Sequence, residues 1–106
     1  MPKYLLRASY SAEGSKGLLK DGGTKRLGAA RTLVESLGGK LDALYFAFGE
    51  TDVVAIVDLP DNATAAAASL TIAGTGALAG TITVLLTPEE IDQASKKSGT
   101  YTPPGR

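Results

Sequence analysis

The stretch LDALYFAFGETDVVAIVDL at residues 41–59 decides the fold of this chain. It consists of two apolar segments that flank a short turn, Gly49-Glu50-Thr51-Asp52, and it contains both phenylalanines of the sequence. Aromatic and β-branched side chains on either side of a glycine-containing turn are typical of a β-hairpin. The stretch therefore predicts two antiparallel strands in the middle of the chain.

The turn also predicts how the two strands of this hairpin pair. A three-residue loop would pair Phe48 with Asp52 and would place Asp42 opposite Asp58, where two like charges repel each other. We therefore expect a four-residue loop at residues 49–52, closed by Phe48 and Val53. Because side chains alternate along a strand, one face then carries Leu44, Phe46, Phe48, Val53, Ala55 and Val57, and the other carries Ala43, Tyr45, Ala47, Val54 and Ile56. Neither face is polar.

The other segments alternate between strand and helix patterns. Residues 3–10 and 78–86 predict strands, and apolar side chains at helical spacing predict a helix at residues 24–37, capped by Thr24. Residues 63–73 predict an alanine-rich helix, capped by Asp61 or Asn62. Another helix begins at Thr87-Pro88-Glu89-Glu90, which has the signature of a capping box, and ends at Gly99. Residues 12–21 predict only a short helical turn, which Gly22-Gly23 ends.

The order of these elements predicts the fold class. A β-α-β-β-α-β order followed by a helix is the ferredoxin-like α+β pattern, in which two helices cover one face of a four-stranded antiparallel sheet. A chain of 106 residues is one domain. We assign residues 1–98 to this domain and residues 99–106 to a tail rich in proline and glycine.

The composition excludes several kinds of chemistry. The chain contains no cysteine and no histidine, so a thiolate zinc site and the usual general base are absent. Its 11 basic and 11 acidic side chains balance, so we expect no nucleic-acid partner. No apolar run approaches the roughly 20 residues of a membrane helix, and no signal peptide precedes the first strand. We therefore expect a cytoplasmic protein without a membrane partner, a cofactor or a metal.

The hairpin predicts self-association. A sheet that helices cover on one side only should present polar side chains to water on its other side. Because neither face of the hairpin is polar, the uncovered side would expose a large apolar patch, which usually marks an interface. We expect a homo-oligomer, dimeric or higher, whose sheets pack face to face as in dimeric α/β-barrel proteins. The candidate interface residues are Leu44, Phe46, Phe48 and Val53. Alternatively, the C-terminal helix and tail cover the second face within one chain.

Five stretches resemble a known family. They are YSAEG at residues 10–14, GLLKDGG at 17–23, LVESLGGKL at 33–41, YFAFGETDVVAIVDLPDN at 45–62 and LLTPEE at 85–90. The chain resembles the GYD domain family, small proteins named for a Gly-Tyr-Asp signature in the hairpin. Thr51 stands where the signature tyrosine is expected, so a role for that ring is not available here. The resemblance implies a ferredoxin-like domain that associates, and it implies no activity, because the function of the family is unknown.

Two groups of side chains are candidates for ligand binding. Tyr10, Tyr45, Glu50 and Asp52 would contact a small molecule, since a carboxylate beside aromatic rings can act as a base near neutral pH. The alternative is that Asp52 stabilises the turn and the tyrosines pack in the core. Lys16, Lys20 and Lys25 lie in a glycine-rich segment that would bind an anion at a helix N-terminus. The alternative there is a solvated connection, because Gly23 stands where a phosphate-binding loop has lysine.

Three functions follow from these observations. The first is a small homo-oligomeric domain whose task is binding or assembly through its sheet. The second is a cofactor-independent enzyme of the dimeric α/β-barrel type, which would act on a small organic molecule in a cavity between helices and sheet. The third is a sensor of small anions. The first is preferred because the sequence shows an apolar hairpin and no recognisable catalytic set.

Overall fold

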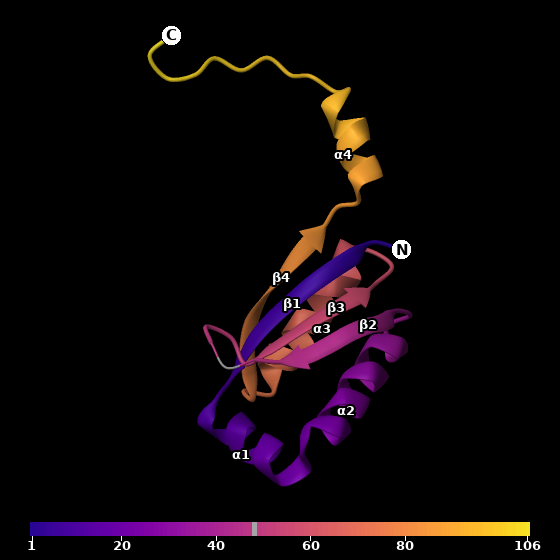
Figure 1. Ribbon diagram of the computed structural model, residues 1–106, viewed down its shortest axis with the longest axis vertical. Helices are drawn as coiled ribbons and strands as arrows, with labels where there is room; N and C mark the ends of the chain where they lie inside the picture. The colour runs from indigo at the N-terminus through magenta and orange to yellow at the C-terminus, as the bar shows by residue number, and fades with distance from the viewer. Residues whose placement is uncertain (48) are drawn as a thin grey trace.

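A four-stranded antiparallel open sheet forms the centre of the protein (Figure 1). The computed structural model describes residues 1–47 and 49–106, and within them the fold is α+β with four helices. The elements are β1 (Lys3–Tyr10), α1 (Ala12–Asp21), α2 (Gly23–Ser36), β2 (Lys40–Phe46), β3 (Val53–Asp58), α3 (Asn62–Gly74), β4 (Leu78–Leu85) and α4 (Pro88–Ser95). None of the helices in this part of the chain is long and apolar enough to cross a membrane.

Strand β1 lies inside the sheet, between β3 and β4, and the strand order is β2-β3-β1-β4. Tyr4 lies opposite Val57 on one side and opposite Val84 on the other. Residues directly opposite each other share a face of an antiparallel sheet, so the even-numbered side chains of β1 and their partners form one face. The odd-numbered side chains of β1, beginning with Lys3, form the other face.

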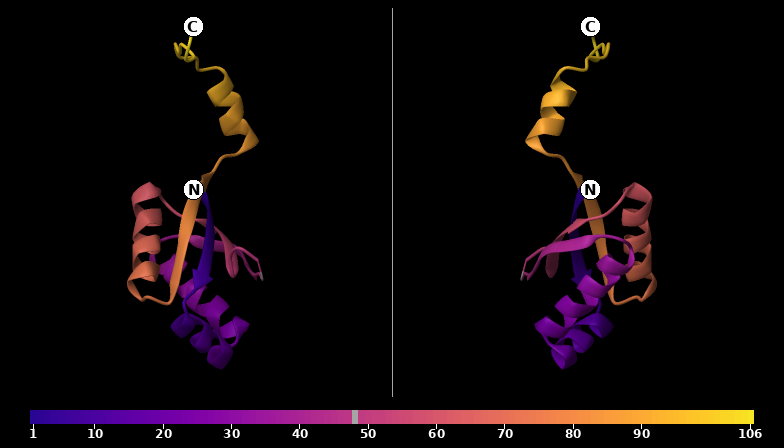
Figure 2. Two further views of the ribbon diagram at one scale, coloured as in Figure 1. Left: turned by 90° about the vertical axis from the view of Figure 1, so that its left-hand side faces the viewer. Right: turned by 90° about the vertical axis from the view of Figure 1, so that its right-hand side faces the viewer.

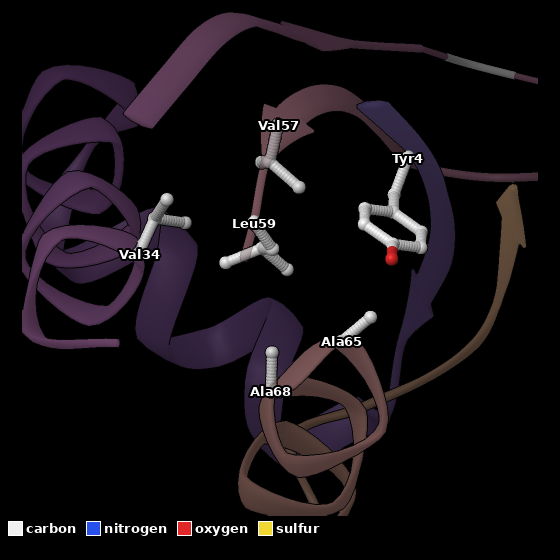
Figure 3. Packing of buried hydrophobic residues seen from close by; sticks show 6 residues of the cluster. All are labelled: Tyr4, Val34, Val57, Leu59, Ala65 and Ala68. Atoms are coloured by element: carbon white, nitrogen blue, oxygen red, sulfur yellow. The ribbon is translucent and has the colours of Figure 1, made fainter. Parts of the chain in front are cut away.

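The core lies between the first of these faces and helices α2 and α3. Figure 3 shows six buried side chains gathered there, which are Tyr4, Val34, Val57, Leu59, Ala65 and Ala68. The ring of Tyr4 is only 1% exposed, and its hydroxyl donates a hydrogen bond of 2.7 Å to Oδ1 of Asn62. Tyr4 therefore packs in the core with its polar atom satisfied. We call this side the helix face, and we call the opposite side the open face.

The segment before α2 is more helical than its sequence predicts. Residues 12–21 form a complete helix of ten residues. The Ser11 hydroxyl caps it by accepting a hydrogen bond of 3.1 Å from the Gly14 amide. The prediction of a short turn was wrong because the cap outweighs the low helix propensity of the glycines in this segment. Gly22, with φ of 80°, separates α1 from α2, and α2 begins at Gly23 without a side-chain cap. The prediction of a Thr24 cap was therefore also wrong.

The hairpin forms, but its register differs from the predicted one. Phe46 lies opposite Val53, and the Ala47 amide donates a hydrogen bond of 2.8 Å to the Asp52 carbonyl. Relative to the predicted pairing, β2 is shifted by two residues, so the side chains of the paired strands from Ala43 to Phe46 and from Val53 to Val57 keep their predicted faces. A register shift between Leu41 and Ala43 then places Lys40 opposite Asp58.

Helix α4 and the tail extend beyond the end of the sheet (Figures 1 and 2). The predicted capping box is confirmed: the Glu90 amide donates to the Thr87 hydroxyl, and the Thr87 amide donates to the Glu90 carboxylate, both at 3.1 Å. No residue of α4 is buried. The alternative that this helix and the tail cover the open face of their own chain is therefore wrong.

We predict that Gly39→Ala strongly destabilises the protein. A Cβ atom at Gly39 would lie 2.2 Å from the Asp58 carbonyl oxygen and 2.7 Å from Cδ2 of Leu59, so α2 and β2 would have to move. We expect a loss of more than about 2 kcal/mol in the free energy of unfolding, measured by urea denaturation. The control is Gly28→Ala in α2, where a Cβ meets no atom within 4 Å. This control should leave the protein equally stable or more stable, and equal losses in both variants would contradict the packing argument.

We predict that the stabilisation contributed by Asp61 depends on pH. The Thr64 hydroxyl and amide donate hydrogen bonds of 2.7 and 2.8 Å to Asp61 at the start of α3, and they lower the pKa of this carboxyl. Because the pKa is lower in the folded state than in the unfolded state, the stabilisation is complete above the unfolded pKa and is lost as pH falls through the folded pKa.

Urea denaturation from neutral pH down to about pH 3 tests this prediction. Asp61→Ala should destabilise the protein at neutral pH, and the difference from the wild type should shrink as the solution becomes acidic. Asp92→Ala, on the exposed helix α4, is the control and should change little. A difference for Asp61→Ala that stays constant with pH would contradict the assignment.

Candidate functional site

A cavity of about 160 Å³ lies between the helix face of the sheet and helices α2 and α3. Strands β1, β2 and β3 contribute Leu6, Leu44 and Val57 to its wall, and the helices contribute Leu33 and Ile72. Only two of the described residues that line the cavity carry a polar side chain, and these are Tyr10 and Arg26. The cavity is therefore an apolar space with very few polar groups.

Alanines create this space. Ala8 of β1, Ala55 of β3 and Ala30 of α2 all line the cavity at positions that face the interior. Within the sheet, Ala8 is next to Val53, and Ala55 is next to Leu6 and Leu44. A methyl group fills much less volume than the leucine or isoleucine that usually occupies such positions, so the two layers do not close on each other.

The two ends of the cavity differ in polarity and exposure. At one end lie Val57 and Leu59, which are buried core residues. At the other end lie Phe46, which is 36% exposed, and Arg26 near the start of α2. A Cβ atom at Gly23 would lie 3.1 Å from the Phe46 ring, so this ring sits against the first turn of α2. One end of the cavity therefore lies at the buried core, and we call the other end, at the first turn of α2, its mouth.

The four predicted ligand contacts do not share one pocket. Tyr10 lines the cavity, but Tyr45 lies on the open face and is 72% exposed. The Asp52 carboxylate accepts a hydrogen bond of 2.9 Å from the Tyr10 backbone amide, and the Asp52 amide donates to the Ala8 carbonyl, also at 2.9 Å. The side chain of Glu50 is 94% exposed, and its carboxylate lies 4.0 Å from the Arg7 guanidinium. Asp52 thus connects the hairpin turn to the end of β1.

The three predicted anion-binding lysines lie on two helices. Lys16 and Lys20 belong to α1, Lys25 belongs to α2, and all three are exposed. Nζ of Lys25 lies 3.5 Å from Oδ1 of Asp21. The other carboxylate oxygen of Asp21, Oδ2, lies 3.7 Å from Nη1 of Arg26. The predicted connecting segment is therefore helical, and one of its lysines already interacts with a carboxylate.

The three predicted interface residues that the structure describes lie on the helix face. Leu44, Phe46 and Val53 line the cavity, and Phe48 lies outside the described residues. The structure therefore places these side chains on the opposite side of the sheet from the open face. The apolar side chains that the hairpin presents on the open face are Ala43, Tyr45, Val54 and Ile56.

The open face carries an apolar patch beside a charged cluster. Leu5 lies opposite Ile56, which lies opposite Ala43, and Val54 lies opposite Tyr45, so these five residues form one patch, called here the hairpin patch. Beyond one end of this patch, the Lys3 ammonium binds the carboxylates of Asp42 and Asp58. On the side of β4, Thr83 lies opposite Leu5, and Arg7 lies between Val54 and Thr81.

Lys3 and Asp42 shift each other's pKa values. Hydrogen bonds from the Lys3 ammonium to Asp42 and Asp58 raise the pKa of Lys3, and the bond to Asp42 lowers the pKa of that carboxyl. The ammonium thus holds two carboxylates that would otherwise repel each other. Lys3 is therefore charged throughout the physiological pH range, and the cluster forms a hydrophilic border to the hairpin patch.

Sequence reasoning missed Arg26 as a residue of the cavity. A usable signal was present, because Arg26, Ala30 and Leu33 recur at spacings of three and four residues and so lie on one side of a helix. This places Arg26 at the N-terminal end of the apolar stripe of α2. The Lys3 cluster had no such signal, since its three members are far apart in the sequence and only the pairing of strands brings them together.

We predict that Asp52→Ala destabilises the protein, because the Tyr10 amide loses its acceptor. We expect a decrease of about 1–2 kcal/mol in the free energy of unfolding, measured by urea denaturation. Glu50→Ala, a change of the same kind in the same turn, should stay within about 0.5 kcal/mol of the wild type. An Asp52→Ala variant as stable as the Glu50→Ala variant would contradict this structural role.

Comparison with known families gives one match. The GYD domain profile matches residues 4–95, which include every helix and strand described above except Lys3, the first residue of β1, and nearly all of the chain. Neither the curated proteins nor the solved structures contain a significant match. The matched region includes the hairpin, the alanine-lined cavity and the open face. The chain belongs to the GYD domain family.

Proposed function

We propose that this protein is a homo-oligomeric domain that assembles through the open face of its sheet. The observation that carries the proposal is the hairpin patch, in which the partly or largely exposed side chains of Leu5, Tyr45, Val54 and Ile56 adjoin one another. Apolar side chains in the middle and charged or polar side chains at the border are the arrangement found in protein interfaces. The Lys3 cluster, Arg7 and Thr83 supply that border.

The proposed assembly is a pair of ferredoxin-like domains whose sheets pack against each other, as in dimeric α/β barrels. The strand order β2-β3-β1-β4 and the location of α2 and α3 at one face support this assignment. The opposite face, which these two helices leave open, is then available to a second copy of the chain. In such a pair the hairpin patch of each copy would lose its contact with water.

The size of the open face is close to what a dimer requires. Four strands of six to eight residues, spaced about 4.8 Å apart, cover at most roughly 19 Å by 26 Å. The accessible area exceeds this flat area because side chains project from the sheet, and a stable interface buries about 800 Å² on each partner. The sheet alone would form an interface at the lower end of the usual range, so additional contacts would stabilise the pair.

The C-terminal arm, defined as residues 86–106, is suited to supply such contacts. Leu86, Ile91 and Tyr101 are 58%, 51% and 78% exposed. The radius of gyration is 17.0 Å, whereas a compact domain of this length has about 13 Å. An isolated helix of eight residues is marginal in water, so packing against a second copy would stabilise α4. The arm therefore adds to the argument for association.

Binding and assembly agree with the site better than catalysis does. No carboxylate is among the described residues that line the cavity. The Asp52 carboxylate accepts a hydrogen bond from the Tyr10 backbone amide, and Glu50 is exposed to solvent in the turn. A cofactor-independent enzyme needs a base beside its substrate, and neither of these residues lies in the cavity.

We predict that Tyr45→Lys weakens the association of the protein. A lysine at Tyr45 would have to lose its hydration when two sheets meet over the hairpin patch. We expect the dissociation constant of the dimer to rise at least about tenfold, because Tyr45 is the largest side chain of the patch and tyrosine is enriched among the residues that contribute most to binding energy. Sedimentation equilibrium at micromolar concentrations measures this constant.

The control is Leu19→Lys, which replaces an apolar side chain that is 86% exposed on α1. It has the same change in charge, lies outside the sheet and should leave the dissociation constant unchanged. A wild-type protein that sediments as a monomer and binds no hydrophobic dye would contradict the proposal. Equal weakening by both variants would show that charge, and not the hairpin patch, governs association.

A further inference from the structure

We propose that the alanine-lined cavity is a binding site for a small organic acid whose apolar body is about the size of a benzene ring. The volume of about 160 Å³ sets the size of the body. The apolar wall sets its polarity, and Arg26 at the mouth sets the charge of the group that remains outside. The apolar lining residues supply the first two properties, and Arg26 supplies the third.

The wall selects an apolar body. A cavity needs several polar partners to hold ordered water, and an apolar cavity of about 150 Å³ stays dry and takes up benzene or xenon. Here leucine, valine, isoleucine and alanine side chains form the wall, and the deep end is closed by Val57 and Leu59. A ring or a short branched chain would gain dispersion contacts that this space now lacks.

The mouth selects an anionic group. Arg26 and Lys25 share one carboxylate, Asp21, so the three side chains carry one excess positive charge. Nη1 of Arg26 lies 3.7 Å from Oδ2 of Asp21, which is longer than a hydrogen bond. A guanidinium has five N–H donors, so donors remain for a ligand carboxylate. The side chain of Arg26 is 37% exposed, which keeps this charge in contact with solvent.

The inference is independent of the proposed assembly. The cavity lies on the helix face, whereas the hairpin patch lies on the open face, and the sheet separates them. A ligand would bind in the cavity of a monomer as well as in that of a dimer. Failure of the assembly test therefore leaves the cavity proposal standing, and failure of the ligand test leaves the assembly proposal standing.

Benzoate, benzyl alcohol and benzylamine test the proposal, because they share a ring and differ in charge. Each is titrated into the full-length protein, and methyl and amide chemical shifts are followed by NMR. We expect saturable shifts at residues lining the cavity, with benzoate bound most tightly and benzylamine most weakly. Arg26→Gln should weaken benzoate by about three- to fivefold, as is usual for a partly exposed ion pair, and should leave benzyl alcohol unchanged.

Two further variants test the location of the site. Ala30→Leu fills the cavity and should abolish binding of all three compounds, whereas Ala66→Leu, on the exposed side of α3, should have no effect. Arg31→Gln, an exposed arginine on the same helix, is the control for Arg26→Gln. Because Arg26 and Arg31 have solvent-accessible side chains, these two variants keep the test valid even if Ala30→Leu does not fold.

Three results would overturn the proposal. The first is the absence of saturable shifts at the cavity with any of the three compounds. The second is an equal effect of Arg26→Gln on benzoate and on benzyl alcohol, which would remove the role of charge at the mouth. The third is a folded Ala30→Leu variant that binds as the wild type does, which would place the bound compound elsewhere.

Discussion

The pairing of β1 with both β3 and β4 is the constraint on which the rest of the structure depends. Because side chains alternate along a strand, this pairing sends Tyr4, Leu6 and Ala8 toward the helices and Lys3, Leu5 and Arg7 toward the open face. The first set forms the core and the cavity wall, and the second set contributes to the hairpin patch and to the charged cluster. A shift by one residue would exchange the two sets.

Small residues decide how closely the two layers approach each other. Gly39 passes so close to the Asp58 carbonyl that no side chain fits there, and Gly14 approaches the Ala77 carbonyl in the same way. Farther inside, Ala8, Ala30 and Ala55 leave a space between the layers. Side chains that line such a space have fewer packing contacts than those of a filled core, which costs free energy. A bound apolar molecule would recover part of this free energy.

The sheet separates two surfaces that invite different partners. On the helix face, the cavity is small and apolar and has Arg26 at its mouth, which suits a small molecule. On the open face, the hairpin patch is broad and shallow and has a hydrophilic border, which suits another sheet. The C-terminal arm belongs with the second surface, because it leaves its own domain with Leu86 and Ile91 exposed.

The sequence alone determined the class of the fold and most of its elements. Local signals, such as the alternation in β1, the apolar stripe of α2 and the capping box of α4, act between residues close in the chain, so they can be read without a structure. The same is true of the two sets of side chains on the hairpin. Their assignment to two faces stayed correct although the predicted register was wrong by two residues, because a shift of two keeps each side chain on its face. Helix α1 was underestimated because the Ser11 cap outweighs the glycines that follow it.

Only the tertiary structure decided which face of the hairpin meets the helices, and therefore that Leu44, Phe46 and Val53 line a cavity. Both faces are apolar, so hydrophobicity could not distinguish them, and only the packing of α2 and α3 did. The tertiary structure also brought Arg26 to the mouth of that cavity and Lys3 to Asp42 and Asp58. These contacts join residues of different elements, and their distances follow from how the elements pack, which no pattern along a single element contains.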